Sequence, residues 1–598
     1  MTHAITVALA QINPVLGDLA GNAARILAVA RQAHEAGARV LLTPELALTG
    51  YPPEDLLLRP EFLRRCEAVL AQLTADLAGL PDLSVVVGTP LRVDDRLFNA
   101  AVVLREGARI GWYGKQALPN YGVFDEQRYF AVGTQACLFE VGGLRFGVNV
   151  CEDLWAGGAP RQAVAQGAQV LLALNASPFD AGHWQARREH VMKPVAALGV
   201  PLVYVNLVGG QDELVFDGAS FVQDAAGTSH MVLPAFGEAL GLVDFDAQGH
   251  VQGGRVLALD GEDWSAATAT AVAVLQPGSQ LPDYRADSTT TRQAAEQQPP
   301  GKTDAYWPDD NGVALSAIWQ ALVLGVRDYV EKNGFKGVLL AFSGGMDSAL
   351  TLLLAVDALG PERVRTYMMP SPYTSDMSLD DAKDMARRVG VHYGVLPIAP
   401  MMDAFESVLA PEFAGLTQDA TEENIQARSR GVLMMALSNK TGWLVLTTGN
   451  KSEFSTGYCT LYGDMAGGFA VLKDVPKTLV YSLGWWRNGL DGTPPIPENI
   501  LTRAPSAELR PGQTDQDSLP PYEVLDGMIA RYMEQDASVD DLRKAGYVQA
   551  DIDRFTRLLH LNEYKRRQSP PGPRITPRAF GRDWRYPITN RFRDNGQG

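Results

Sequence analysis

Short apolar runs rich in β-branched residues alternate with helical stretches over residues 1–275. AITVALAQI at 4–12, LSVVVGTP at 83–90 and VPLVYVNLVG at 200–209 are typical of buried strands, and NAARILAVARQAHEAGA at 22–38 is typical of a helix. This repetition of strand and helix predicts an α/β domain. Because α/β folds bind ligands at the carboxyl ends of their strands, polar residues that follow these runs are candidates for chemistry.

Residues 276–311 are rich in Pro, Gln, Thr, Asp and Ser and poor in apolar residues that could form a core. This composition predicts a linker or a strap along the surface. The GKT at 301–303 resembles the end of a nucleotide-binding P-loop, but that motif requires a glycine where this chain has Glu296. We therefore reject it as a nucleotide site.

The alternation of strands and helices resumes at residue 312. The sequence predicts an amphipathic helix at 312–334 and a strand at 335–342, followed by SGGMDS at 343–348 and a further helix. This order is typical of a doubly wound parallel sheet that carries a ligand loop after its first strand. We therefore expect two α/β domains, residues 1–275 and 312–598, joined by the linker.

Composition and charge exclude several classes of protein. The 598 residues are 46% hydrophobic and carry a formal net charge of −17, which argues against a nucleic-acid binder or a protein of anionic membranes. The four cysteines are too few for a disulfide framework and indicate reduced thiols and a cytoplasmic location. The first residues lack the basic segment of a signal peptide, and no apolar run approaches the roughly 18 residues that span a bilayer.

Three polar residues of the first domain carry the functional groups that acyl transfer requires. Cys151 in NVCEDLW ends a predicted strand, Glu45 in PELALTGYPPEDL follows another, and Lys115 begins KQALPNYGVFDEQRYF. A thiol can attack a carbonyl, a carboxylate can accept its proton, and an ammonium can stabilise the oxyanion. An isolated cysteine is more often a small buried apolar residue, so the interpretation depends on all three residues together.

These three segments resemble, in order and spacing, the Glu, Lys and Cys segments of the nitrilase superfamily. The resemblance implies an αββα sandwich that cleaves a carbon–nitrogen bond through a thioester, with Glu45 as proton acceptor, Lys115 as oxyanion stabiliser and Cys151 as nucleophile. We expect Glu152 and Asp153 to shape the cleft or to be solvated at its rim. The positions that bind glutamine in amidases of this type are occupied by Tyr121, Ser177 and His183, of which the first two also suit plain turns.

The SGGMDS loop at 343–348 has the parts of an anion site. Its two glycines let backbone amides approach a phosphate, its serines offer hydroxyls, and the following helix adds the positive end of its dipole. The lysine of a P-loop is missing, which favours binding of pyrophosphate, and Asp347 is available for Mg²⁺. The loop resembles that of the N-type ATP pyrophosphatases, which implies attack at the α-phosphate of ATP and an adenylated intermediate.

Longer segments of the second half resemble the glutamine-dependent NAD⁺ synthetases, among them TEENIQARSRG, LTTGNKSEF and NEYKRRQSPPGPR. The resemblance covers residues 1–598 and implies a ligase that amidates deamido-NAD⁺ with ATP, Mg²⁺ and glutamine, giving NAD⁺, AMP, pyrophosphate and glutamate. The residues that it assigns are Ser343, Gly344, Gly345, Met346, Asp347, Ser348 and Thr448 for ATP; Asn424, Glu453 and Lys565 for deamido-NAD⁺; and Asp347 and Glu453 for the metal.

We also expect a sheltered channel for ammonia, because free ammonia would be protonated and diluted in bulk water, and a homo-oligomer. Other functions fit parts of the sequence. A different adenylating amidotransferase would normally carry another type of glutaminase, and Thr2 stands where one such type has an N-terminal cysteine. An amidase fused to a nucleotide sensor would share the motifs without releasing pyrophosphate, and a structural scaffold would leave Glu45, Lys115 and Cys151 as coincidence.

Overall fold

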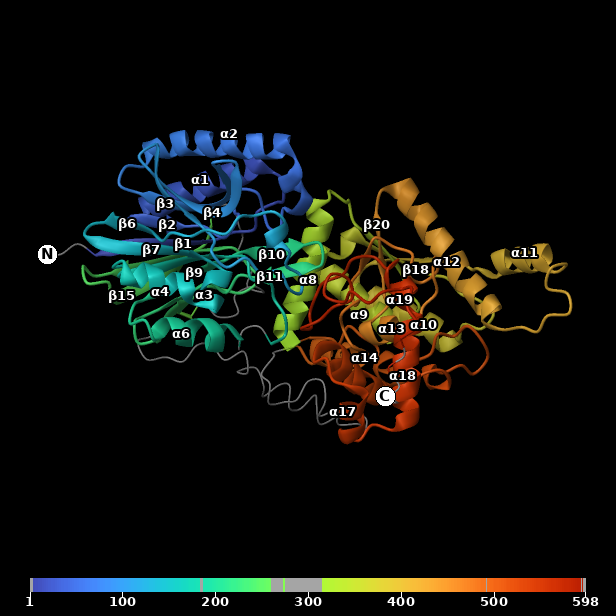
Figure 1. The fold of residues 1–598 in the computed structure, drawn as a ribbon. Helices are drawn as coiled ribbons and strands as arrows, with labels where there is room; N and C mark the ends of the chain where they lie inside the picture. The colour runs from blue at the N-terminus through green and yellow to red at the C-terminus, as the bar shows by residue number, and fades with distance from the viewer. Residues whose placement is uncertain are drawn as a thin grey trace. The chain divides into compact units, whose positions relative to one another are not determined.

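The computed structural model describes residues 4–182, 186–259, 273–274, 315–490, 492–592 and 594 (Figure 1). Residues 1–283 and 284–598 form two separate units. The predicted linker at 276–311 lies outside the described residues. None of the described helices is both long enough and apolar enough to cross a membrane.

Two seven-stranded sheets form the centre of the first unit. The order in one sheet is β15 (Val251–Leu257), β14 (Ala239–Phe245), β1 (Ile5–Gln11), β2 (Val40–Leu42), β3 (Ser84–Val93), β4 (Arg96–Arg105) and β5 (Ala108–Gly114). The order in the other is β16 (Ala273–Val274), β13 (Ser229–Val232), β12 (Phe221–Gln223), β9 (Leu202–Asn206), β8 (Val170–Asn175), β7 (Leu144–Val150) and β6 (Cys137–Val141). A separate hairpin pairs β10 (Val208–Gln211) with β11 (Leu214–Asp217).

Helix α1 begins at Leu19 and ends at Glu35, three residues earlier at each end than the predicted helix at 22–38. The early start has a local cause, because the side chain of Asp18 accepts a hydrogen bond from the backbone N–H of Gly21 and caps the helix. The other α-helices in the described part of this unit are α2 (Pro60–Asp76), α3 (Glu152–Ala156), α4 (Gly158–Ala165) and α6 (Lys193–Ala196).

Strand β1 shows why the central strands are apolar along their whole length. Val7 and Leu9 point into the core between the two sheets, while Ala8 and Ala10 point to the opposite face, where α1 and α2 pack. Full burial of a Val or Leu side chain contributes about 1.5–3 kcal/mol. Helices α4 and α6 cover the outer face of the second sheet in the same way, which confirms the predicted αββα sandwich.

A five-stranded parallel sheet forms the centre of the second unit. The chain enters it at the central strand, extends it to one edge and then returns to the other side. Ligands bind where strand order reverses in this way, so the position after the central strand is the expected binding region. The order is β19 (His392–Val395), β18 (Val364–Met368), β17 (Val338–Ala341), β20 (Leu444–Thr447) and β21 (Phe469–Ala470), which confirms the predicted doubly wound sheet.

The helices of the second unit include α9 (Met346–Leu359), which starts directly after the SGGMDS loop. The other α-helices in the described part of this unit are α8 (Leu315–Lys332), α10 (Asp376–Val389), α11 (Ala399–Leu409), α12 (Ala420–Thr441), α13 (Lys451–Thr456), α14 (Lys477–Asn488), α15 (Glu498–Thr502), α16 (Tyr522–Ile529), α17 (Val539–Lys544), α18 (Gln549–Leu561) and α19 (Glu563–Arg566).

The segment at residues 564–585, which is rich in Lys and Arg, packs back onto its own unit. The backbone N–H of Ala470 donates to the carbonyl oxygen of Pro571 at 2.8 Å, and Lys473 Nζ donates to that of Pro570 at 2.8 Å. Phe580 and Trp584 are buried in a core shared with α16 and α18. This segment is therefore part of the fold of the second unit.

We predict that Gly88→Ala destabilises the first unit. A Cβ at Gly88 in β3 would lie 2.3 Å from the carbonyl oxygen of Pro44 and 2.5 Å from the backbone nitrogen of Leu46. The segment that carries Glu45 would have to move, at an expected cost of about 1–3 kcal/mol. Gly79→Ala is the matched control, because a Cβ there meets nothing within 4 Å. Equal unfolding midpoints of the two variants in urea would contradict the prediction.

Candidate active sites

Strand β8 brings two of the predicted catalytic residues together. The backbone N–H of Cys151, which follows β7, donates to the carbonyl oxygen of Leu174 at 2.9 Å. The backbone N–H of Glu45 donates to the carbonyl oxygen of Asn175 at 3.4 Å. Since Glu45 follows β2 of one sheet and β8 belongs to the other, the loop after β2 reaches across the sandwich.

Lys115 lies between two buried carboxylates. Its Nζ is 2.8 Å from Glu45 Oε1 and 2.8 Å from Glu126 Oε1, and the lysine side chain is 1% exposed. Burial alone would lower the pKa of Lys115, but the charges of Glu126 and Glu45 outweigh it and raise the pKa well above its ordinary value. Lys115 therefore stays a cation.

Glu126 is a member of this site that sequence reasoning missed. Its Oε1 also accepts from the hydroxyl of Tyr51 at 2.9 Å, and burial raises its pKa while Lys115 lowers it. Glu45 has further donors in Asn99 Nδ2 at 2.6 Å and the backbone N–H of Ala176 at 3.1 Å. The one available signal was that Glu126 lies in the same segment as Lys115.

Cys151 occupies a strained turn between β7 and α3. Its φ of 44° with ψ of −98° is uncommon for a residue with a Cβ, and such strain is concentrated at functional positions. The side chain is buried. Burial and the charge of Glu45 raise the pKa of the Cys151 thiol well above its ordinary value, while Lys115 acts in the opposite direction. The group at rest is therefore a thiol, which needs a base before it can attack.

The predicted glutamine-binding residues lie in different surroundings. The hydroxyl of Tyr121 donates to the carboxylate of Glu152, next to Cys151, at 3.0 and 3.1 Å. Ser177 is buried after β8, and its backbone N–H donates to Asn206 Oδ1 at 2.9 Å. His183 lies outside the described residues.

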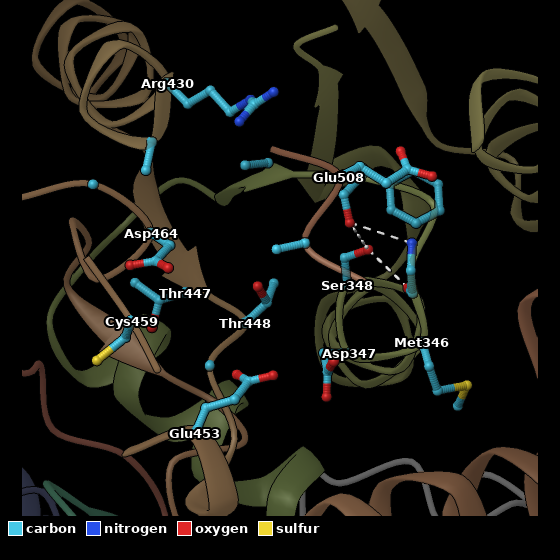
Figure 2. Close-up of a pocket in the computed structure, with 18 of the residues that line it drawn as sticks. Met346, Asp347, Ser348, Arg430, Thr447, Thr448, Glu453, Cys459, Asp464 and Glu508 are labelled. Carbon is cyan, nitrogen blue, oxygen red and sulfur yellow. Dashed lines mark hydrogen bonds between the residues drawn. The ribbon is translucent and has the colours of Figure 1, made fainter. Parts of the chain in front are cut away.

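A cavity of about 300 Å³ opens in the second unit at the carboxyl end of β17 and β20 (Figure 2). Arg430, Asp464 and Lys477 also line this cavity. The residues predicted for ATP or metal that line it are Ser343, Gly345, Met346, Asp347, Ser348, Thr448 and Glu453.

The SGGMDS loop is held by its own hydroxyls. The backbone N–H of Gly345 donates to Ser343 Oγ at 3.2 Å, and Ser348 Oγ donates to the carbonyl oxygen of Gly345 at 2.9 Å. Gly344 has a φ of +76°, and a Cβ there would lie 2.6 Å from the carbonyl oxygen of Ser378. Arg503 donates to the carbonyl oxygen of Gly344, so a positive side chain adjoins the loop.

Two acidic residues meet at one wall of the cavity. Lys477 Nζ donates to Asp347 Oδ2 and lies 3.4 Å from Glu453 Oε1. Asn450 Nδ2 donates to Asp347 Oδ1 at 3.0 Å. Burial and the neighbouring charge of Asp347 raise the pKa of Glu453 to about 8, although Lys477 lowers it. Two crowded carboxylates favour the approach of a further cation.

The described residues contain no cluster of three or more His, Cys, Asp or Glu side chains that could hold a metal ion by themselves. The pair Asp347 and Glu453 fits Mg²⁺ in a different way. This ion usually takes only one or two protein carboxylates and completes its shell with water and substrate phosphates. Such an arrangement suits a pair of acids beside a phosphate loop.

Comparison with known proteins matches both halves of the chain. Residues 6–251 match the carbon-nitrogen hydrolase family and residues 318–569 match the NAD synthase family. The chain is 44% identical over 596 residues to the glutamine-dependent NAD(+) synthetase of Xanthomonas campestris pv. campestris, covering 99% of this chain and 98% of that protein. It is 43% identical to the one of Acinetobacter baylyi, with 98% of each covered. The chain belongs to the glutamine-dependent NAD(+) synthetases.

Solved structures of this family agree with the fold described above. The glutamine-dependent NAD⁺ synthetase of Acinetobacter baumannii in complex with ADP superposes with a TM-score of 0.72 and 41% identity, over 98% of this chain and 99% of that one. The one from Cytophaga hutchinsonii has a TM-score of 0.73 at 21% identity, over 98% of each chain, and supports the fold alone. The resemblances found in the sequence are thereby confirmed at the level of family and fold.

Two residues that the sequence resemblance predicts to bind deamido-NAD⁺ contact the segment after α13. Lys565 Nζ donates to the carbonyl oxygens of Gly457 and Cys459 at 2.7 and 2.8 Å. Thr460 Oγ1 donates to Asn424 Oδ1 at 2.9 Å. Neither Lys565 nor Asn424 is among the residues that line the cavity, so their assignment to the dinucleotide stays a prediction.

We predict that alkylation of Cys151 by iodoacetamide accelerates about tenfold per unit between about pH 7 and about pH 9, because the thiolate reacts and the thiol predominates. Lys115→Met should slow it, since this change removes a positive charge that lowers the pKa of Cys151. Peptide mass spectrometry separates Cys151 from the half-buried Cys459. A rate independent of pH would contradict the prediction, because alkylation would then not require loss of the thiol proton to the solvent.

We predict that Gly344→Ala weakens ATP binding about tenfold or more, because the variant must adopt a left-handed backbone and its methyl group collides with the carbonyl of Ser378. Gly390→Ala is the matched control, since its φ of +79° imposes the same left-handed backbone, a Cβ there meets nothing within 4 Å, and Gly390 does not line the cavity. Isothermal titration calorimetry compares the two. Equal affinities would show that the conformation of Gly344 is not needed for binding.

Proposed function

We propose that Glu45, Lys115 and Cys151 hydrolyse glutamine in the first unit, and that the SGGMDS loop activates deamido-NAD⁺ with ATP in the second. The overall reaction follows from the family: the enzyme is a glutamine-hydrolysing ligase that amidates deamido-NAD⁺ to NAD⁺ at the expense of ATP. The observation that carries the assignment of roles is the contact of Lys115 with Glu45 beside a thiol on a strained turn.

In the first unit, Cys151 Sγ attacks the side-chain carbonyl of glutamine while Glu45 takes the thiol proton. Lys115 donates to the oxyanion of the tetrahedral intermediate, which then collapses to a thioester and expels ammonia with the proton returned from Glu45. Water activated by Glu45 then attacks the thioester, and glutamate leaves. Glu126 supports these steps by holding Lys115 as a cation at a fixed place.

In the second unit, we assign the pyrophosphate of ATP to the loop of Ser343, Gly344, Gly345, Met346, Asp347 and Ser348, with Thr448 nearby. The carboxylate of deamido-NAD⁺ attacks the α-phosphorus, pyrophosphate leaves, and ammonia then displaces AMP from the activated carbonyl. Activation is required because a carboxylate is a poor electrophile with a poor leaving group. Asp347 and Glu453 would hold Mg²⁺, which would neutralise phosphate charge when bound.

The remaining assignments are proposals of the same kind. Tyr121, Ser177 and His183 would bind glutamine, and Asn424, Glu453 and Lys565 would bind deamido-NAD⁺. Lys477 lies where an ammonium could contact the phosphates of ATP. We also propose a sheltered channel for ammonia, because ammonia that escapes into water is protonated and no longer nucleophilic. A cytoplasmic location and a homo-oligomeric state complete the proposal.

We predict that Cys151→Ala loses glutamine-dependent formation of NAD⁺ by at least about 10³-fold and keeps ammonium-dependent formation, because the nucleophile serves only the first reaction. Both rates are measured with deamido-NAD⁺, ATP and Mg²⁺, together with release of pyrophosphate. Cys66→Ala, at a buried cysteine of α2, is the matched control and should keep both rates. Retention of the glutamine-dependent rate by Cys151→Ala would overturn the assignment of the nucleophile.

A further inference from the structure

Asp153, two residues after the candidate nucleophile, is buried and has four hydrogen-bond donors. Its Oδ1 accepts from the backbone N–H groups of Gln116 at 3.0 Å and Ala117 at 2.8 Å. Its Oδ2 accepts from the hydroxyl of Tyr113 at 2.8 Å and the backbone N–H of Val150 at 3.0 Å. The side chain therefore does not lie at a solvated rim, which was one of the two expectations from the sequence.

These donors flank the two residues that must act together. Tyr113, Gln116 and Ala117 lie on either side of Lys115, and Val150 directly precedes Cys151. One carboxylate thus joins the end of β5, in the first sheet, to the turn after β7, in the second. Three of the four donors are backbone N–H groups, at Gln116, Ala117 and Val150, so the carboxylate holds the backbone of both segments directly.

A purely local role would explain only one of the four contacts. Asp153 lies in the first turn of α3, where an acidic side chain commonly accepts from a nearby backbone N–H, as it does here from Val150. The other three donors lie 36 to 40 residues earlier in the chain. Stabilisation of the start of α3 does not require them.

The chemistry of the four donors selects a carboxylate. An ionised carboxylate accepts at both oxygens, whereas the amide of asparagine accepts at one end and donates at the other. In Asp153→Asn, the amide group would face either two backbone N–H groups or a backbone N–H and a hydroxyl. A buried donor that faces another donor loses its hydrogen bond and repels its neighbour. The segment that carries Lys115 and the segment that carries Cys151 should therefore separate slightly.

We propose that Asp153 is a positioning residue for glutamine hydrolysis, and that it sets the distance between the Lys115 ammonium and the Cys151 thiol by fixing the backbone of both segments. The inference rests on the proposed roles of Lys115 and Cys151. It concerns the chemical step more than the binding of glutamine, because none of its contacts involves Tyr121 or Ser177.

The test measures kcat and KM for glutamine hydrolysis by the full-length enzyme with deamido-NAD⁺ and ATP present. Asp153→Asn should lower kcat about 100-fold, since small displacements of reacting groups have effects of this size. KM should change by no more than about threefold, because glutamine binding is retained. Tyr113→Phe removes one of the four donors and should lower kcat about fivefold.

Asp246→Asn is the matched control. Asp246 accepts from the backbone N–H groups of Gln248 and His250 in the turn between β14 and β15, so the same chemical change is made away from Lys115 and Cys151. It should leave kcat and KM unchanged. Ammonium-dependent formation of NAD⁺ should persist in all three variants and serves as the measure of intact fold.

The proposal is overturned if Asp153→Asn keeps kcat within about twofold of the wild type, or if KM rises while kcat is unchanged. If Asp153→Asn does not fold, Tyr113→Phe decides in its place, and an unchanged kcat for that variant overturns the proposal. Failure of the underlying assignment has a different signature, since Cys151→Ala would then continue to hydrolyse glutamine.

Discussion

The geometry of the first unit depends on one buried ammonium ion between two carboxylates. Removing such charges from water costs several kcal/mol per ion unless each is paired and hydrogen-bonded. Lys115 meets this demand with Glu45 and Glu126, and Glu45 in turn takes donors from Asn99 in β4 and Ala176 after β8. Those partners come from both sheets, so the charges are satisfied only when the two sheets pack in one arrangement. The sandwich and the candidate site are therefore specified by the same contacts.

The second unit meets a related electrostatic demand, again with one ammonium for two carboxylates. Asp347 and Glu453 share the single ammonium of Lys477, and the pKa of Glu453 rises to about 8. The first site has the same two-to-one ratio of carboxylates to ammonium. Neutral donors assist the acids in both sites, Tyr51 and Asn99 in the first and Asn450 in the second. Asp347 lines a cavity, where a metal ion and the phosphates of a nucleotide can approach. The arrangement therefore suits binding of a cation together with an anionic substrate.

Features whose causes are local could be predicted from the sequence. The strands, the α/β class of both units, the doubly wound sheet and the phosphate loop depend on the spacing of apolar residues and on glycines next to one another in the chain. The αββα sandwich was implied by the resemblance to the nitrilase superfamily. Glu126 and the role of Asp153 could not be predicted, because their importance comes from donors as many as 40 to 75 residues away. The shift of α1 by three residues reflects a cap, Asp18, that the apolar pattern does not contain. Asn424 and Lys565 match the family in sequence, yet their contacts here are with the segment after α13, so the sequence alone does not fix what they bind.

The high pKa of the Cys151 thiol explains why the strained turn and the hydrogen bonds of Asp153 both matter for the reaction. A resting thiolate would attack readily at any time, whereas a thiol attacks only when a base removes its proton in the same step. That requirement makes the rate depend on where Glu45 and Lys115 lie relative to the sulfur. Because Asp153 fixes the backbone before Cys151 and after Lys115, an error of position in either segment would reach the reacting atoms directly. A buried thiol with a distant proton acceptor would be inert. In this half of the enzyme, the reactivity of Cys151 therefore depends on the fixed positions of Glu45 and Lys115 and not on a low pKa of the thiol.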